Sequence, residues 1–211
     1  MQGLYNINEK TKTAANAKTW ITPGIHENLK LVDVKYDISK NGKEFLAFYV
    51  ENEKGDTVSC TEWPFNPRKP FEQMDATEKE TAISIIENQK SKVKQIVEVF
   101  KPNFNISAES FKDFAEKTIA FLGDSYKNKP IRLKVVFDKR GWTTFGQSAR
   151  AVFVENMSIA EDASKIRILP SDKLIRPAQP DDEKTESNPV DIVEGAADAG
   201  LAPVADEAPL F

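Results

Sequence analysis

Residues 28–63, NLKLVDVKYDISKNGKEFLAFYVENEKGDTVSCTEW, decide the fold of this chain. Apolar and polar side chains alternate from 28 to 37, which is typical of a half-buried strand. The loop 39–43 contains an Asn-Gly pair, which tolerates the positive backbone dihedrals of a tight hairpin turn. A second turn follows near Gly55. The stretch therefore predicts a three-stranded meander with later strands over 44–51 and 56–63, and two consecutive apolar residues, Leu31 and Val32, indicate a bulge in the first strand.

The periodicity then changes from two to about 3.6, which predicts helices. Asp75 and Glu78 have the spacing of a capping box, and Pro102 forbids the helix to continue beyond it. A second helix is expected to start at Ser107 and to end before Gly123. Both helices have one apolar face, so we expect them to cover a sheet.

Strand character returns at 131–138, at 150–156 and more weakly at 165–169. Five strands interrupted by helix after the third is the element order of the oligonucleotide-binding (OB) barrel. The sequence therefore predicts a mostly β, α+β fold: a five-stranded OB-fold barrel with helices between strands three and four. Sequence order alone is also compatible with other α+β folds.

Charge divides the chain into three parts: a flexible arm at 1–19, one domain at 20–176 and an acidic tail at 177–211. The tail holds nine carboxylates, one lysine and five prolines, which predicts disorder. The whole chain has a formal net charge of −4, so a tail near −8 leaves a body near +4. This asymmetry favours a nucleic-acid binder whose tail recruits proteins and competes with the polyanion. The alternative is a tail that only improves solubility.

Other functional classes find little support in the sequence. Cys60 and His26 are the single cysteine and histidine, so we expect no disulfide, metal or other cofactor. Cys60 is expected in the core, and His26 is expected to stabilise a turn. Phosphate-binding loops, nucleophile elbows and acid–base pairs are missing, which predicts a non-enzymatic protein. No signal peptide or long apolar run is found, so a cytoplasmic protein without a membrane anchor is expected.

In an OB barrel the ligand crosses strands two and three and is gripped by the loops between strands one and two and between strands four and five. The first loop supplies Lys40 and Lys43. The second combines cations with aromatic rings, which are the two parts that single-stranded nucleic acid requires. Its candidate residues are Lys139, Arg140, Trp142, Phe145 and Arg150. For Trp142 and Phe145 the alternative is a hydrophobic plug at the barrel mouth.

The strands offer further candidates. Strand two places Phe45, Ala47 and Tyr49 on one side and Leu46, Phe48 and Val50 on the other. The pattern leaves open which side is exposed, and the alternative is that the helices bury both sides. Tyr49 is the preferred stacking residue because its hydroxyl tolerates water. Trp63 ends a polar row on strand three and extends the same platform. On strand four, Arg132 and Lys134 share a side, as phosphate contacts or as a solvated face.

Several of these motifs resemble a known family. The segment 21–28, ITPGIHEN, followed by the Lys-Asn-Gly-Lys loop, the apolar strand 45–50 and the ending Cys60-Thr-Glu-Trp63, resembles single-stranded DNA-binding proteins of phage replication modules. The acidic C-terminal tail is similar to that of bacterial single-stranded DNA-binding proteins, which ends in Pro-Phe and docks on replication and repair enzymes. The matching tail residues here are Asp206, Glu207, Pro209, Leu210 and Phe211, with Leu210 between the proline and the phenylalanine.

The resemblance implies an OB-fold protein that binds and protects single-stranded DNA, without strong sequence preference, during phage DNA replication, recombination or repair. It also implies a bacterial host cytoplasm and partner proteins that bind the tail. Two alternatives remain open from the residues. One is an RNA-binding module on the same barrel, and the other is a scaffold protein that binds no nucleic acid.

Overall fold

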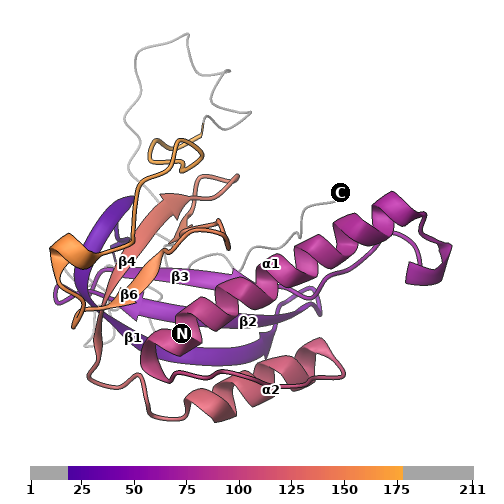
Figure 1. The fold of residues 1–211 in the computed structure, drawn as a ribbon, viewed down its shortest axis with the longest axis horizontal. Coiled ribbons are helices and arrows are strands. Elements are labelled where there is room, and N and C mark those ends of the chain that lie inside the picture. The colour runs from indigo at the N-terminus through magenta and orange to yellow at the C-terminus, as the bar shows by residue number, and fades with distance from the viewer. Residues whose placement is uncertain (1–18, 178–211) are drawn as a thin grey trace, which may run out of the picture.

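The computed structural model describes residues 19–177, which form an antiparallel sheet of six strands with two α-helices (Figure 1). The ordered path through the sheet is β3-β2-β1-β4-β5, and β6 pairs with β4. The strands are β1 Gly24–Ile38, β2 Glu44–Glu51, β3 Thr57–Glu62, β4 Pro130–Phe137, β5 Thr143–Phe145 and β6 Val154–Asn156. The helices are α1 Ala76–Phe100 and α2 Phe111–Leu122, with 3₁₀ turns at Phe71–Gln73 and Glu161–Ala163.

Strand β1 is long enough to pair with two other strands. Its first half pairs with β4 from Gly24 to Lys30, and its second half pairs with β2 from Lys30 to Ile38. The register with β2 shifts between Leu31 and Asp33, which confirms the bulge predicted from the two consecutive apolar residues. Leu31 and Val34 therefore both reach the core, while Val32 at the bulge is exposed. The predicted three-stranded meander is confirmed.

The first helix agrees with its sequence signals. The Asp75 carboxylate accepts from the Glu78 backbone N–H at 2.9 Å, and the Glu78 carboxylate accepts from the Asp75 N–H at 2.8 Å. This reciprocal capping box starts α1, and the helix ends at Phe100, before Pro102. The predicted start of the second helix at Ser107 is wrong, because Ser110 is the residue whose hydroxyl caps it. Its predicted end before Gly123 is confirmed.

The second half of the sheet differs more from the prediction. Strand β4 is close to the predicted strand at 131–138, but the predicted strand at 150–156 shortens to β6. The segment 165–169 is not a strand, and β5 is an additional short strand inside the predicted loop. The ladders describe an open sheet of mixed α+β architecture. Strands β3 and β5 approach each other, but no ladder joins them within residues 19–177.

The core lies between the concave side of the sheet and the helices. Leu46, Phe48 and Val50 of β2 enter it together with Val93 and Val97 of α1. On the other side of β2, Phe45 and Ala47 are buried as well, and only Tyr49 is partly exposed. The outer side of β4 is covered by chain beyond β6 rather than by a helix. None of the helices within residues 19–177 has both the length and the apolar character required to span a membrane.

Candidate nucleic-acid interface

The side of β2 and β3 that faces away from the helices carries aromatic and hydroxyl side chains. Tyr49 lies opposite Ser59, and Ala47 lies opposite Thr61 in the β2–β3 ladder. The Tyr49 ring is half-buried, and the Lys35 ammonium of β1 lies 5.6 Å from the ring centroid. Burial raises the pKa of the Tyr49 hydroxyl against the opposing effect of Lys35. The ring therefore remains a neutral surface with a cation beside it.

Trp63 continues this surface at the end of β3. Its ring packs at 5.3 Å from the Phe45 ring, with an angle of 44° between the planes. The Trp63 backbone carbonyl accepts a hydrogen bond of 2.6 Å from the Gln89 side chain of α1. Helix and sheet thus hold the partly exposed indole in place. We call the outer side chains of Tyr49, Ser59, Thr61 and Trp63 the β2–β3 platform.

Acidic groups limit one side of the platform. Asp33 and Asp37 of β1 lie opposite Tyr49 and Phe45 in the ladder. Lys35 lies between them and bonds the Asp37 carboxylate at 3.2 Å. The carboxylates on the β1 side of the platform would repel a polyanion, so the β3 side of the platform is the more favourable side for DNA.

The loop 39–43 is a compact turn that presents one lysine to solvent. Gly42 has a φ of 74°, and its N–H donates to the Ser39 carbonyl at 2.9 Å. The Ser39 hydroxyl accepts from the Lys43 N–H at 3.0 Å. Lys40 is exposed, whereas Lys43 is partly buried. The Asn-Gly pair therefore forms the predicted hairpin and leaves Lys40 as its most accessible cation.

The loop between β4 and β5 is a tight turn built around one carboxylate. The Asp138 side chain accepts from the backbone N–H groups of Arg140 and Trp142, both at 2.9 Å. Gly141 has a φ of 79°, which the turn requires. Trp142 is 42% exposed and Lys139 is exposed, while Arg140 is partly buried. An accessible indole beside two cations is therefore held by a rigid turn, and the Trp142 side chain is not a plug.

Phe145 lies in the core, so its predicted role in stacking on DNA does not fit the structure. Its exposed fraction is 1%, and it belongs to the main apolar cluster. The physical reason is that β5 begins at Thr143 and pairs with β4, so Phe145 points inward opposite Val135. Of the two aromatic residues of the predicted loop, Phe145 is therefore the buried one and Trp142 the exposed one.

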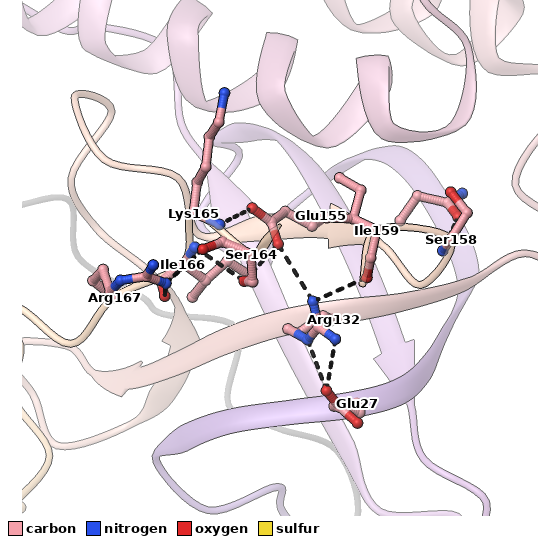
Figure 2. Close-up of polar contacts among 10 residues, drawn as sticks. Glu27, Arg132, Glu155, Ser158, Ile159, Ser164, Lys165, Ile166 and Arg167 are labelled. Atoms are coloured by element: carbon pink, nitrogen blue, oxygen red, sulfur yellow. Dashed lines mark hydrogen bonds and ion pairs between the residues drawn. The ribbon is translucent and has the colours of Figure 1, made fainter. Parts of the chain in front are cut away.

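Arg132 is also removed from the candidate surface, because it is buried and its guanidinium bonds Glu27, Glu155 and the Ile159 carbonyl (Figure 2). It is 4% exposed, and its Nε and Nη2 atoms both lie 2.8 Å from Glu27 Oε1. Its Nη1 atom lies 3.5 Å from Glu155 Oε2 of β6, and the same oxygen accepts from the Ser164 hydroxyl at 2.7 Å. The guanidinium therefore links β1, β4, β6 and the chain beyond β6, and it is not available to a phosphate.

Lys134, two residues further along β4, is also buried and paired inside the protein. Its exposed fraction is 0%, and its ammonium bonds Asp172 at 2.7 Å and the Arg167 carbonyl at 3.0 Å. The Phe137 N–H then donates to the Lys173 carbonyl at 2.7 Å. Residues 157–173, which we call the covering segment, thus lie on the outer side of β4. The predicted DNA contacts of Arg132 and Lys134 do not fit, because both cations are neutralised inside the protein.

Arg150 lies at a cleft of about 400 Å³ where residues 147–150 meet the end of β3 and helix α1. Glu62 is buried there, and its carboxylate accepts from the Lys92 ammonium at 2.5 Å and from the Gln89 amide at 3.2 Å. Burial is the largest single effect and lowers the pKa of Lys92, but the Glu62 carboxylate and the nearby Cys60 thiol together raise it, so the net shift is upward. The cleft therefore places Arg150 near the end of β3, on the helix side of the sheet and opposite to the side chains of the β2–β3 platform.

Trp20 is an aromatic residue that sequence reasoning missed as a candidate. It is 40% exposed and lies beside the first residue of β3, where the Ile21 N–H donates to the Thr57 carbonyl at 3.0 Å. The Thr57 N–H in turn donates to the Thr19 carbonyl at 2.9 Å. The residues before Pro23 show no periodicity, so no signal in the sequence marked this position. Only the bridge between Trp20 and Thr57 shows that this indole lies beside the start of β3.

Cys60 and His26 take the structural roles predicted for them. Cys60 is buried in the core, and this burial raises the pKa of its thiol, followed by the effect of the nearby Glu62 carboxylate. A ring nitrogen of His26 lies 2.7 Å from the Thr22 carbonyl, across a turn. Within residues 19–177, no group of His, Cys, Asp and Glu side chains is arranged to hold a metal ion.

The predicted partner-binding residues of the tail, Asp206, Glu207, Pro209, Leu210 and Phe211, lie outside the described residues, as does most of the arm at 1–19. No known protein-family model matches the chain. No curated protein matches it either.

Proposed function

We propose that this protein binds and protects single-stranded DNA, without strong sequence preference, during phage DNA replication, recombination or repair. The observation that carries the proposal is the exposed Trp142 indole, which a rigid turn holds beside Lys139 and Arg140. The β2–β3 platform adds Tyr49 and Trp63. Flat rings stack on unpaired bases of any sequence, and cations neutralise the phosphates between them.

The topology supports a finer proposal, that the sheet closes into a five-stranded OB barrel. The path β3-β2-β1-β4-β5 would become a ring if β3 joined β5. These two strands already approach each other. Strand β6 would then extend one end of the barrel beside β4. A closed barrel of this order presents β2 and β3 as its ligand face.

The proposed division of roles follows from exposure. Lys40, Lys43, Lys139, Arg140 and Arg150 would contact phosphates, and Tyr49, Trp63 and Trp142 would stack on bases. Stacking contributes about 1–3 kcal/mol per base, whereas an exposed ion pair contributes about 0–1 kcal/mol. The indoles therefore supply more of the proposed affinity than any one lysine. We infer a binding role rather than catalysis.

The acidic tail is proposed to recruit replication or repair proteins and to compete with DNA. The covering segment supports this arrangement, because the Phe137–Lys173 hydrogen bond holds the chain beside the end of β4. The tail sequence begins only a few residues later, and Asp138 of the Trp142 turn follows Phe137 directly. The last described part of the covering segment therefore lies near the proposed DNA-binding loop, and the nine carboxylates follow it in sequence.

Titration with oligo-dT tests the proposal, because quenching of tryptophan fluorescence reports binding and stacking together. We expect quenching, and we expect log affinity to fall with log salt by about 0.7 per neutralised phosphate. A matched RNA oligomer and a DNA duplex are the controls, and both should bind more weakly. Tighter binding of the RNA would favour an RNA-binding module. An absence of binding at low salt would favour a scaffold protein and contradict the proposal.

A further inference from the structure

We propose that the cleft between residues 147–150, β3 and α1 is a pocket for one base of the bound DNA strand. This inference rests on the proposed function and extends it to a second mode of contact. The cleft has a volume of about 400 Å³, which is within the range of small-molecule sites. The cleft lies on the helix side of the sheet, where Glu62, the last residue of β3, lines it. A strand that passes Trp63 at the end of the platform would turn past the end of β3 to enter it.

The chemistry of the lining favours a neutral, hydrogen-bonding ligand. Asn88 and Gln89 contribute carboxamides from α1, and Gln147 contributes one from the loop. Carboxamides both donate and accept hydrogen bonds, so they match the mixed edge of a nucleobase. Ile85 supplies an apolar wall for the face of the ring. Because an amide can present either group, the pocket accepts different bases, which agrees with weak sequence preference.

The charges of the cleft argue against a free phosphate as its occupant. Lys92 is neutralised by Glu62 at 2.5 Å, and this carboxylate would repel an anion placed beside it. Arg150 is exposed at the cleft and forms no ion pair to the residues that the structure describes. It is placed to contact the phosphate next to an inserted base, while the base itself faces the amides.

The pocket is fixed before any ligand arrives. The Gln95 side chain donates to the Ala149 carbonyl at 2.9 Å, which ties the loop to α1. The Gln147 amide nitrogen donates to the Phe145 carbonyl at 3.1 Å, so its side-chain oxygen remains to accept from a ligand. On the opposite wall, Gln89 bonds Glu62 and Trp63. Binding therefore requires little ordering of the loop.

The test fills the pocket with an indole by the substitution Asn88→Trp. Asn88 is exposed on α1, so the variant should fold, and circular dichroism checks this. Thr81→Trp is the matched control, because Thr81 is exposed two turns earlier on the same helix and does not line the cleft. Affinity is measured by fluorescence anisotropy with labelled oligo-dT and with an abasic oligonucleotide, each about ten nucleotides long.

We expect Asn88→Trp to weaken binding of oligo-dT by about tenfold and to leave binding of the abasic strand unchanged. Thr81→Trp should bind both strands as the wild type does. In the wild-type protein, the side-chain amide NMR signals of Asn88 and Gln147 should shift with oligo-dT and not with the abasic strand. Normal oligo-dT binding by Asn88→Trp, or unshifted amide signals, would overturn the pocket alone. Failure of the wild type to bind either strand would instead overturn the proposed function.

Discussion

Trp142 and Lys43 represent the two kinds of contact that the proposed interface combines. The Trp142 ring is exposed on a rigid turn, so stacking requires no rearrangement. Lys43 is a partly buried lysine in the first hairpin loop. Stacking and ion pairing differ in strength, so substitution of each residue should change DNA affinity by a different amount.

We predict that Trp142→Ala weakens oligo-dT binding by about 1–3 kcal/mol and that Lys43→Ala weakens it by less than about 1 kcal/mol. Fluorescence anisotropy of a labelled oligonucleotide measures both variants without relying on protein tryptophan. Lys40→Ala serves as a second lysine control, because Lys40 is more exposed than Lys43. A larger loss for either lysine than for Trp142 would contradict the stacking role.

Cys60 provides a probe of folding. Burial raises the pKa of its thiol, so the native protein keeps it protonated at neutral pH. We predict negligible reaction of native protein with a thiol reagent at about pH 8, and fast reaction after denaturant unfolds it. Absorbance of the released chromophore measures both rates. Fast labelling of the native protein would mean that β3 opens readily from the sheet.

The alternation of residues predicted which side chains share a side of a strand. It did not predict which of the two sides is exposed to solvent. Alternation correctly placed Leu46, Phe48 and Val50 together, and the core shows that theirs is the inner side. The same reasoning placed Arg132 and Lys134 together on β4 but could not reveal what covers them. The covering segment is irregular and has no periodicity, so nothing local in the sequence indicated that two cations would be buried.

At the scale of elements, the Lys134–Asp172 pair fastens the covering segment to β4. Both side chains are buried, so loss of one partner leaves an uncompensated charge in the protein interior. We predict that Asp172→Asn lowers the free energy of unfolding by about 3–5 kcal/mol, as measured by urea denaturation.

The double variant Lys134→Met with Asp172→Leu is the matched control, because it removes both charges and keeps apolar volume. Its stability should exceed that of Asp172→Asn. Equal stability of Asp172→Asn and the wild type would show that the segment is not held by this pair. Breaking an exposed pair such as Lys127–Asp124 should change stability much less than Asp172→Asn does, because solvent screens that pair.

The elements that sequence predicted well have local signals. The Asp75–Glu78 box and the Asn-Gly turn act through neighbours within four residues, so their chemistry is visible in the chain. Strand β5 has only three residues, and its pairing with β4 depends on the turn at Asp138 rather than on its own alternation. The alternation of apolar and polar residues is therefore too short to predict β5.

At the scale of the molecule, charge separation between body and tail predicts competition for the same surface. Deletion of residues 177–211 removes nine carboxylates and one lysine. We predict tighter binding to oligo-dT, with the largest gain at low salt because screening weakens the competition at higher salt. A full-length variant with the tail carboxylates changed to amides should behave like the deletion. Equal affinity of all three proteins across ionic strengths would remove the competitive role.

Closure of the sheet is the part of the whole molecule that sequence could not settle. Element order predicted the first four strands and the helical insert, but it missed β5 and assigned a strand at 165–169 that is not formed. Whether β3 and β5 join depends on register and on the size of Phe145 and its neighbours. Those are properties of the packed core rather than of any one segment.

The shared strand β1 also sets the order in which the protein can assemble. Its pairing with β2 joins residues near in sequence, whereas Leu29 meets Ile131 only after about one hundred further residues have been synthesised. Until then, half of β1 is an unpaired edge on the ribosome, and closing so long a loop slows folding. The edge of β1 that pairs with β4 therefore stays open until β4 has been synthesised. Until then, this edge can pair with strands of other chains.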